Sequence, residues 1–409
     1  GIQTLMTQVD GWSGNGNAGF YIIGDQLTSY NLTASLNSGT DSYNRPSRYL
    51  RDVNGFYHIV VRLDTTQSTA SNRCRWYVNG EQLTDFVYAN YPSLNQDCNF
   101  NGGDPHGIGS HTTGTGNYFD GIMSHVHFAD GQSLEPTVFG STDSTTGEWT
   151  ININPTFTLG THGFTILKDG NTITDQSSNS NDWSLSGGTL TKTEDCPDNV
   201  FATLNGILQT NEILSNGNTS ANSASATWSY VATTIGVSSG KWYAEFLCSG
   251  AANTFMHGVT DLQYATRQGG YIGAATIARG VGYLSINGSS YIDDTTSGYG
   301  ASYVVGDIIG CALDMDNNKV YFSKNGVWQN SGDPTSGATG TGALSLPTTG
   351  TYGFGTSNKD DSTTRANFGN GYFGTTAVSS AGTNASGNGI FEYDVPTGYT
   401  ALSTKGLNL

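Results

Sequence analysis

Residues 305–332 read VGDIIGCALDMDNNKVYFSKNGVWQNSG and carry the clearest structural pattern of the chain. Two apolar runs rich in β-branched and aromatic residues are separated by Asp316-Asn317-Asn318, and the second run ends at Asn325-Gly326. Asn-Gly pairs tolerate the positive φ angles of tight hairpin turns. Short apolar runs bounded by such turns are typical of strands. The stretch therefore predicts a meander of antiparallel strands.

The same turn signals recur along all 409 residues. Asn-Gly or Asp-Gly pairs stand at 10–11, 15–16, 54–55, 79–80, 120–121, 169–170, 287–288 and 325–326. Between them lie short runs that alternate apolar and polar residues, among them 56–63, 74–78, 241–247 and 320–323. No long stretch follows the period of a helix. The pattern predicts an all-β protein made of two tandem antiparallel β-sandwiches of jelly-roll type.

Charge and composition narrow the choice of partners. Only 12% of the residues are charged, and the formal net charge is −17. Such a surface repels phosphate groups, so neither nucleic acid nor an anionic membrane is an expected partner. No apolar run reaches the roughly 18 residues of a membrane-spanning helix, and no signal peptide is visible. Because the first residue is Gly1, we expect a chain that is processed, truncated or part of something longer.

The five cysteines do not form the dense, even-numbered pattern of a disulfide framework. No two of them are spaced as C-x-x-C. Cys74, Cys248 and Cys311 lie inside apolar, strand-like runs. We therefore expect these three to be small buried hydrophobic residues, since unpaired cysteine is among the most buried residue types.

The first half of the chain, residues 1–195, carries an ordered series of motifs: GFYHIVVRLDTT (55–66), NRCRWYVNGEQLT (72–84), HGIGSH (106–111) and NYFDGIMSHVHFADGQSL (117–134). The series resembles a LamG, or concanavalin-A-like, jelly roll. Its continuation, EPTVFGSTDSTTGEW (135–149), resembles the versions found in phage proteins. The resemblance implies one or two further strands before Gly1, and hence an N-terminally incomplete domain. We therefore expect the edge near Thr4 to Thr7 to pair with upstream residues or a neighbouring subunit.

The second half, residues 196–409, follows a polar junction at 175–198. Its motifs are TIGVSSGKWYAEF (234–246), GVGYLSINGSSY (280–291), the opening stretch 305–332, TYGFGTS (351–357), RANFGNGYF (365–373) and FEYDVPTGYTALSTKGLN (391–408). These motifs, in this order, resemble a SPRY domain. The pair of domains resembles the LamG-plus-SPRY proteins of phage fibres and appendages.

The catalytic motifs stand in the wrong context. Residues 236–240 match the G-x-S-x-G nucleophile elbow, but a strand-like run follows where the elbow needs a helix. Glucanases of the concanavalin-like fold need carboxylates spaced E-x-D-x-x-E on one strand, so that the nucleophile and the acid share a face. No such triplet occurs in the chain. We expect no enzymatic activity and no cofactor.

Two patterns could suit metal ions. Residues 314–318 read D-x-D-x-N, but the glycine and distant glutamate of a calcium loop are missing, so a hairpin turn is preferred. His125 and His127 flank Val126 in an alternating run. We expect both histidines to face solvent; an axial metal site in a trimeric fibre is the alternative. No metal ligand set is predicted.

Candidate binding residues are aromatic and acidic side chains in polar surroundings. Trp12, Trp149 and Trp328 lie within two residues of Gly, Ser or Asn, where they stack on sugar rings or plug the end of a sandwich. The segment 288–303, GSSYIDDTTSGYGASY, reads as a long polar loop. Its Tyr291 and Tyr299 offer stacking surfaces, and its Asp293 and Asp294 accept hydrogen bonds. The alternative is a solvated connection whose tyrosines pack on the sandwich edge.

These observations predict a non-enzymatic viral structural protein on the virion surface or outside the cell. The resemblance implies a fibre, spike or appendage that presents loops for binding host-surface glycan or protein. Its partners would be other virion proteins and further copies of itself. Three alternatives stay open: a capsid decoration or adaptor protein, a bacterial extracellular adhesin or filament subunit, and a polysaccharide depolymerase.

Overall fold

The computed structural model of the chain is nearly all β, which confirms the predicted fold class. It describes residues 2–8, 18–30, 32, 42–52, 55–98, 101, 105–110, 116–119, 121–145, 147–168, 172–187, 190, 193–197, 199–207, 211–266 and 269–408. Its helices are single 3-10 turns: η1 (Ala70–Asn72), η2 (Pro136–Val138), η3 (Gln329–Ser331), η4 (Pro334–Thr339) and η5 (Gly406–Asn408). Within these ranges no helix is long and apolar enough to cross a membrane.

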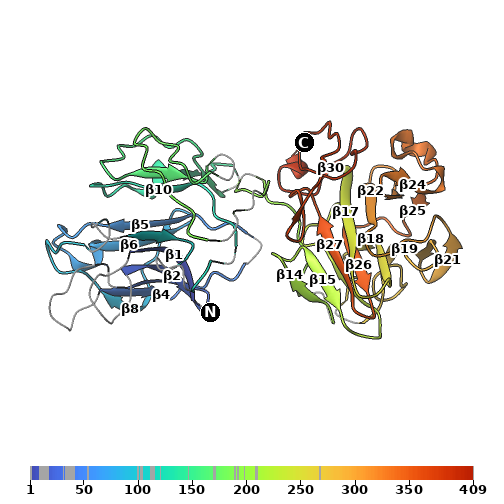
Figure 1. Cartoon of the computed structure of the whole chain (residues 1–409), viewed down its shortest axis with the longest axis horizontal. Coiled ribbons are helices and arrows are strands. Elements are labelled where there is room, and N and C mark those ends of the chain that lie inside the picture. Colours follow the sequence, from blue (N-terminus) through green and yellow to red (C-terminus); the bar gives the residue numbers. More distant parts are fainter. Residues whose placement is uncertain are drawn as a thin grey trace. The chain divides into compact units, whose positions relative to one another are not determined.

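The chain divides into two compact units, Gly1–Lys192 and Thr193–Leu409. The sequence placed the division after residue 195, inside the polar junction. Figure 1 shows both units, the first in blue to green and the second in yellow-green to red.

Unit 1 contains a six-stranded antiparallel sheet, a three-stranded sheet and two short strand pairs. The six-stranded sheet has the order β8 (Phe86–Asn90), β4 (Tyr43–Pro46), β3 (Gln26–Tyr30), β2 (Ala18–Ile23), β1 (Ile2–Gln8), β9 (His106–Ile108). The three-stranded sheet is β5 (Ile59–Leu63), β6 (Cys74–Val78) and β7 (Glu81–Gln82). The pairs are β10 (Val126–Phe128) with β13 (Phe164–Ile166), and β11 (Gly140–Thr142) with β12 (Trp149–Ile151).

The core of unit 1 gathers around β6. Cys74, Trp76 and Val78 alternate along the strand and are all buried, as the sequence predicts. They pack with apolar side chains of the six-stranded sheet, and Phe20 meets Trp76 edge-on with ring centroids 5.5 Å apart. The two sheets therefore share one hydrophobic interior, as in a sandwich.

The prediction that the edge near Thr4 to Thr7 pairs with upstream residues or a neighbouring subunit is wrong. Strand β1 lies inside the sheet, with β2 on one side and β9 on the other. Met6 is opposite Ile108, and Gln8 is opposite His106. The partner β9 is about a hundred residues away in sequence, so local pattern does not reveal the pairing.

Unit 2 is built from two larger sheets. One has the order β14 (Ile213–Ser215), β15 (Ser220–Ser223), β27 (Ser362–Asn367), β17 (Lys241–Gly250), β22 (Ile308–Asp314), β23 (Lys319–Lys324), β24 (Val327–Trp328), with β25 (Leu344–Ser345) on β23 and β30 (Thr400–Ala401) on β17. The other has the order β16 (Ser229–Ala232), β26 (Tyr352–Asn358), β18 (Phe255–Asp261), β19 (Gly280–Leu284), β20 (Ser289–Ile292), β21 (Thr295–Gly298). A small pair, β28 (Tyr372–Phe373) and β29 (Thr376–Ala377), completes the unit.

The stretch 305–332 folds as the predicted meander of β22, β23 and β24. Asn325 and Gly326 have φ of 49° and 80°, as a tight hairpin turn requires. The D-x-D-x-N stretch is the other turn, in which the Asp314 carboxylate accepts the Asn317 backbone N–H at 3.0 Å. Cys311 on β22 and Cys248 on β17 are buried among aromatic side chains, as predicted. All five cysteines are free thiols.

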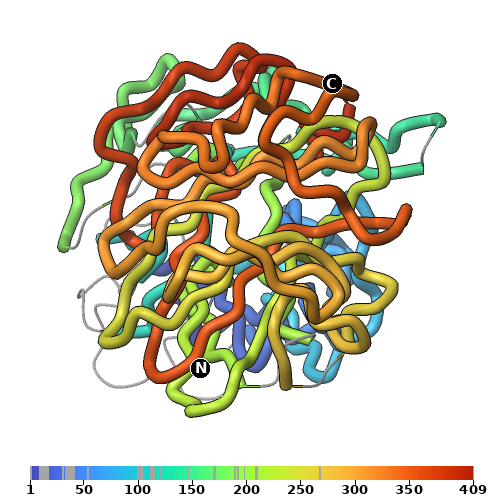
Figure 2. Tube along the Cα trace, turned by 90° about the vertical axis from the view of Figure 1, so that its right-hand side faces the viewer, coloured from blue at the N-terminus to red at the C-terminus, as the bar shows by residue number. Residues whose placement is uncertain are grey.

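Two predicted segments have a different form. Residues 288–303 are largely not a loop, because β20 and β21 form a hairpin within them. The motif 117–134 has one strand among its described residues, β10; His125, just before it, has φ of 52°, which interrupts the extended backbone. Strands β21, β24 and β25 lie at the right-hand side of unit 2 in Figure 1, which is the side that faces the viewer in Figure 2.

Candidate functional site

A long connection joins β18 to β19, and its described residues, 262–266 and 269–279, pack against one face of the six-stranded sheet of unit 2. Its Gly270 N–H donates to Trp228 O at 3.0 Å, and its Ile272 N–H donates to Ser357 Oγ at 3.0 Å. The buried Tyr230 hydroxyl accepts the Thr266 N–H at 2.7 Å and donates to Ile277 O at 2.9 Å. The connection is therefore tied down at both ends and along its middle.

Aromatic rings gather where this connection meets the β20–β21 hairpin. Tyr271 contacts Tyr291 edge-on, with ring centroids 5.6 Å apart, and Trp228 contacts Tyr271 at 6.4 Å. The Arg279 guanidinium lies 5.4 Å from the centroid of the Tyr264 ring. Tyr264 is 40% exposed and is the most accessible ring of the group.

Two carboxylates complete this surface. Asp293 accepts two hydrogen bonds from Arg279 Nε and one from Nη2, at 2.8–3.1 Å. Asp294 accepts the Tyr271 hydroxyl at 3.0 Å and the Ala275 N–H at 3.3 Å. Burial and then this hydrogen bond raise the pKa of Tyr271. We call these six residues, Tyr264, Tyr271, Arg279, Tyr291, Asp293 and Asp294, the tyrosine surface.

The structure brings together three of the predicted site residues: Tyr291, Asp293 and Asp294. The sequence missed Tyr264, Tyr271 and Arg279. The available signal was a run with two tyrosines and two arginines, LQYATRQGGYIGAATIARG (262–280), between two apolar strands. A connection of that length without periodicity often carries function.

Tyr299 does not belong to this surface. It is only 7% exposed, and its ring packs against Tyr283 and Phe322 with centroids 5.5 and 5.9 Å away. Its hydroxyl accepts the Phe322 backbone N–H at 3.1 Å. A ring so enclosed offers no face to a ligand, so the predicted stacking role does not fit its position.

The predicted tryptophans are packing residues wherever they are described. Trp149 donates its indole N–H to His58 Nδ1 at 3.0 Å and stacks on that ring. It also lies over Gly80, where an added Cβ would come within 2.2 Å of the indole. Trp328 is half-buried against the core, 6.4 Å from the Tyr243 ring. Trp12 lies outside the described residues.

The histidine prediction is wrong for His127. Its ring lies between Phe139 and Phe157, with centroids 5.8 and 5.9 Å away, and its Nδ1 is 2.9 Å from Thr165 Oγ1. Burial lowers the pKa of His127 to about 4. Among the described residues, no three His, Cys, Asp or Glu side chains are grouped as metal ligands.

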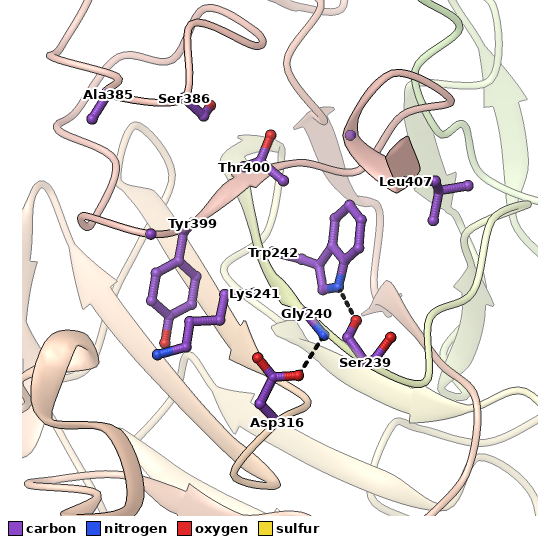
Figure 3. A pocket seen from close by; sticks show the side chains of 12 residues that line it. Ser239, Gly240, Lys241, Trp242, Asp316, Ala385, Ser386, Tyr399, Thr400 and Leu407 are labelled. Carbon is purple, nitrogen blue, oxygen red and sulfur yellow. Dashed lines mark hydrogen bonds between the residues drawn. The ribbon is translucent and has the colours of Figure 1, made fainter. Parts of the chain in front are cut away.

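A groove of about 560 Å³ lies on unit 2 where β17 begins. Figure 3 shows Lys241 beside Tyr399, with Trp242 between them and Leu407. The Lys241 ammonium is 3.2 Å from Asp314 Oδ2 and 5.7 Å from the Tyr399 ring centroid. The Trp242 indole donates to Ser239 O at 2.7 Å. The Lys241 ammonium is already paired with Asp314, and the Trp242 and Tyr399 rings are buried. The groove therefore presents neither a free charge nor an open ring face to a ligand.

A second exposed surface lies at the other end of the β19–β20 hairpin. Ile286, Val304, Val305 and Val327 are all exposed apolar side chains. Their segments are joined by hydrogen bonds from Tyr303 N to Ser285 O, at 3.0 Å, and from Lys324 Nζ to Ser302 O, at 2.9 Å. We call these four residues the valine patch. The sequence missed it, although each member is next to, or one residue from, a turn Gly or Asn.

One known family matches a part of unit 2. Residues 241–347 match the SPRY domain family. The chain contains a SPRY domain. The tyrosine surface and the valine patch both lie within the matched residues of this SPRY domain. The match begins after unit 1 ends, so the LamG-like nature of unit 1 stays a prediction.

Two solved SPRY domains are similar to part of this chain. One is the SPRY domain of human HERC1, with 16% identity over 40% of this chain and 96% of that chain, and a TM-score of 0.32. Another is a human SPRY domain, with 15% identity over 39% of this chain and 95% of that chain, and a TM-score of 0.30. No curated protein matches the chain.

Proposed function

We propose that this chain is a non-enzymatic recognition protein of a virus surface: a subunit of a fibre, spike or appendage that binds the host. The tyrosine surface of the SPRY domain is the binding site in this proposal. The observation that carries it is the arrangement of Tyr264, Tyr271 and Tyr291 around two carboxylates held by Arg279 and a tyrosine hydroxyl.

This arrangement suits recognition because its members are fixed before a partner arrives. Asp293 is fixed by Arg279, and Asp294 is fixed by Tyr271. A pre-organised surface loses little conformational entropy on binding. Tyrosine and arginine are also the residue types that most often dominate binding energy at interfaces. Rings and carboxylates together suit either an apolar–basic protein segment or a sugar.

The partner class favoured here is a host-surface protein. SPRY domains are generally protein-interaction modules. The most accessible ring of the tyrosine surface, Tyr264, already has Arg279 over it, which restricts the flat stacking that a sugar needs. Glycan binding, which the sequence predicts, is the alternative outcome of the experiment.

The test uses the fluorescently labelled chain and cells of the host of the encoding virus. Tyr264→Ala is expected to weaken saturable binding about 5- to 30-fold, since truncating a central interface aromatic costs about 1–2 kcal/mol. Tyr118→Ala is the matched control, because Tyr118 is an exposed tyrosine of unit 1. Equal binding by wild type and Tyr264→Ala, with unchanged melting, would refute the site.

Cells treated with protease or with periodate separate the two partner classes. Loss of binding after protease alone supports a protein receptor. Loss after periodate alone supports a glycan and overturns the favoured class while leaving the site in place.

The valine patch favours a second candidate function, a decoration or adaptor protein that binds another virion protein. Ile286 and Val327 are 62% and 67% exposed. Large exposed apolar side chains are common at protein–protein interfaces. Val327→Asp would then abolish assembly of the chain onto purified particles and leave host-cell binding of the free chain intact. Normal assembly of Val327→Asp would contradict this candidate.

A further inference from the structure

Strand β21 forms an open edge of the SPRY domain. It pairs with β20 on one side and is the last strand of its six-stranded sheet (Figure 1). All four of its residues, Thr295, Thr296, Ser297 and Gly298, are exposed and uncharged. The strand at the opposite edge, β16, is buried along its whole length.

The turn that precedes β21 determines which backbone groups point outward. Asp293 and Asp294 have φ of 47° and 61° and form a two-residue turn closed by the pair Ile292 and Thr295. The closing pair of such a hairpin exchanges hydrogen bonds, and bonded pairs alternate along the ladder. Thr295 and Ser297 therefore bond to β20, while the N–H and C=O groups of Thr296 and Gly298 point away from the sheet.

This edge, although only four residues long, lacks three of the features that normally prevent strand pairing. Proteins protect edges with lysine, proline or a β-bulge. Strand β21 contains neither residue, and its register against β20 runs without a shift. The edge strand β8 of unit 1 differs, because its register against β4 shifts between Arg45 and Pro46. A regular, unprotected edge is suited to accept another strand.

We propose that β21 pairs with β21 of a second copy of this chain, antiparallel, about a two-fold axis through Ser297. In this register Thr296 of one copy faces Gly298 of the other. Both residues point outward, so each of the two equivalent pairs exchanges two N–H···O bonds. The two six-stranded sheets become one continuous sheet, and the interface is the same patch on both copies, as two-fold symmetry requires.

The net charge of −17 does not oppose this pairing. Strand β21 is neutral, so no like charges meet across the pairing. The antiparallel arrangement also places the acidic turns, Asp293 and Asp294, at opposite ends of the joined strands. A parallel arrangement would bring the two turns together and is disfavoured. This inference does not depend on what the tyrosine surface binds.

The experiment measures the mass of the full chain in solution by sedimentation velocity. The wild type is expected to be a dimer at micromolar concentration. Thr296→Pro removes one outward N–H without touching the bonds to β20, and proline is tolerated at such an edge position. It should weaken dimerisation at least 10-fold. Thr296→Val keeps the N–H and the side-chain shape, and should dimerise as the wild type does.

Amide hydrogen exchange provides a readout that needs no variant. The amides of Thr296 and Gly298 should be protected at high concentration and should exchange freely on dilution, while those of Thr295 and Ser297 stay protected throughout. A monomeric wild type, a Thr296→Pro dimer as strong as the wild type, or exchange at Thr296 that is independent of concentration would each overturn the proposal.

Discussion

Replacing Glu245 with Gln should remove a large part of the pH dependence of the stability of the SPRY domain. Glu245 lies on β17 and is fully buried. Its carboxylate accepts the backbone N–H groups of Glu392 at 2.8 Å and Tyr393 at 2.9 Å, and the Tyr243 hydroxyl at 3.1 Å. It thereby fixes the C-terminal segment onto the sheet. Burial raises the pKa of Glu245 to about 7.

The direction of the effect follows from the raised pKa. Between pH 4.5 and about 7 the folded state holds a proton that the unfolded state releases. The stability that Glu245 contributes is therefore fully present below pH 4.5 and is lost as the pH rises through 7. A shift from 4.5 to about 7 corresponds to about 3 kcal/mol. Gln does not ionise, so the variant lacks this loss.

The assay is urea unfolding of wild type and Glu245→Gln at pH 5 and pH 8. The wild type should lose about 3 kcal/mol more than the variant between the two values. The absolute stability of the variant is expected to be lower at pH 5, because the amide N–H₂ cannot accept the second backbone N–H. Glu81→Gln, on the surface of unit 1, is the control for the substitution itself. Parallel losses in wild type and Glu245→Gln would refute the reasoning.

Three further substitutions test the packing of the SPRY domain by denaturant unfolding. Tyr299→Phe deprives the buried Phe322 N–H of its acceptor and should lower the free energy of unfolding by about 1–3 kcal/mol without changing host-cell binding. Unchanged stability would contradict the core position of Tyr299. Burial lowers the pKa of His257 to about 3, so its contribution to folding stability is present above pH 6.5 and is lost as the pH falls towards 3. His257→Phe should therefore unfold less readily than wild type at pH 4. Equal acid sensitivity of the two proteins would show this to be wrong. A Cβ at residue 258 would lie 2.0 Å from Val281 O, so Gly258→Ala should cost about 3 kcal/mol or more, and a wild-type midpoint would exclude this clash.

Much of the fold could be predicted because its signals are local. The pair Asn325-Gly326 predicts a turn from its own two residues. The alternation of Cys74, Trp76 and Val78 predicts a buried strand face from a single short segment. The pairing of β1 with β9 could not be predicted in this way. It joins segments about a hundred residues apart, and the residue pattern of one strand does not indicate which other strand it pairs with.

The candidate site was predicted only in part, for a related reason. Tyr291 and Tyr299 look alike in the sequence, yet one borders the tyrosine surface and the other lies in the core. In the hairpin register Tyr291 is opposite Thr296, whereas Tyr299 follows the last paired residue, Gly298. Tyr264 and Arg279 reach the surface through a connection without periodicity, so only the folded chain brings them together.

The central claim is that the tyrosine surface contacts the host, and photo-crosslinking tests it most directly. A benzophenone amino acid is introduced at position 264, or at position 118 as the control, and each labelled chain is irradiated on host cells. The account predicts a crosslinked host-surface molecule from position 264 and none from position 118. Crosslinking from position 118 with none from position 264 would contradict it.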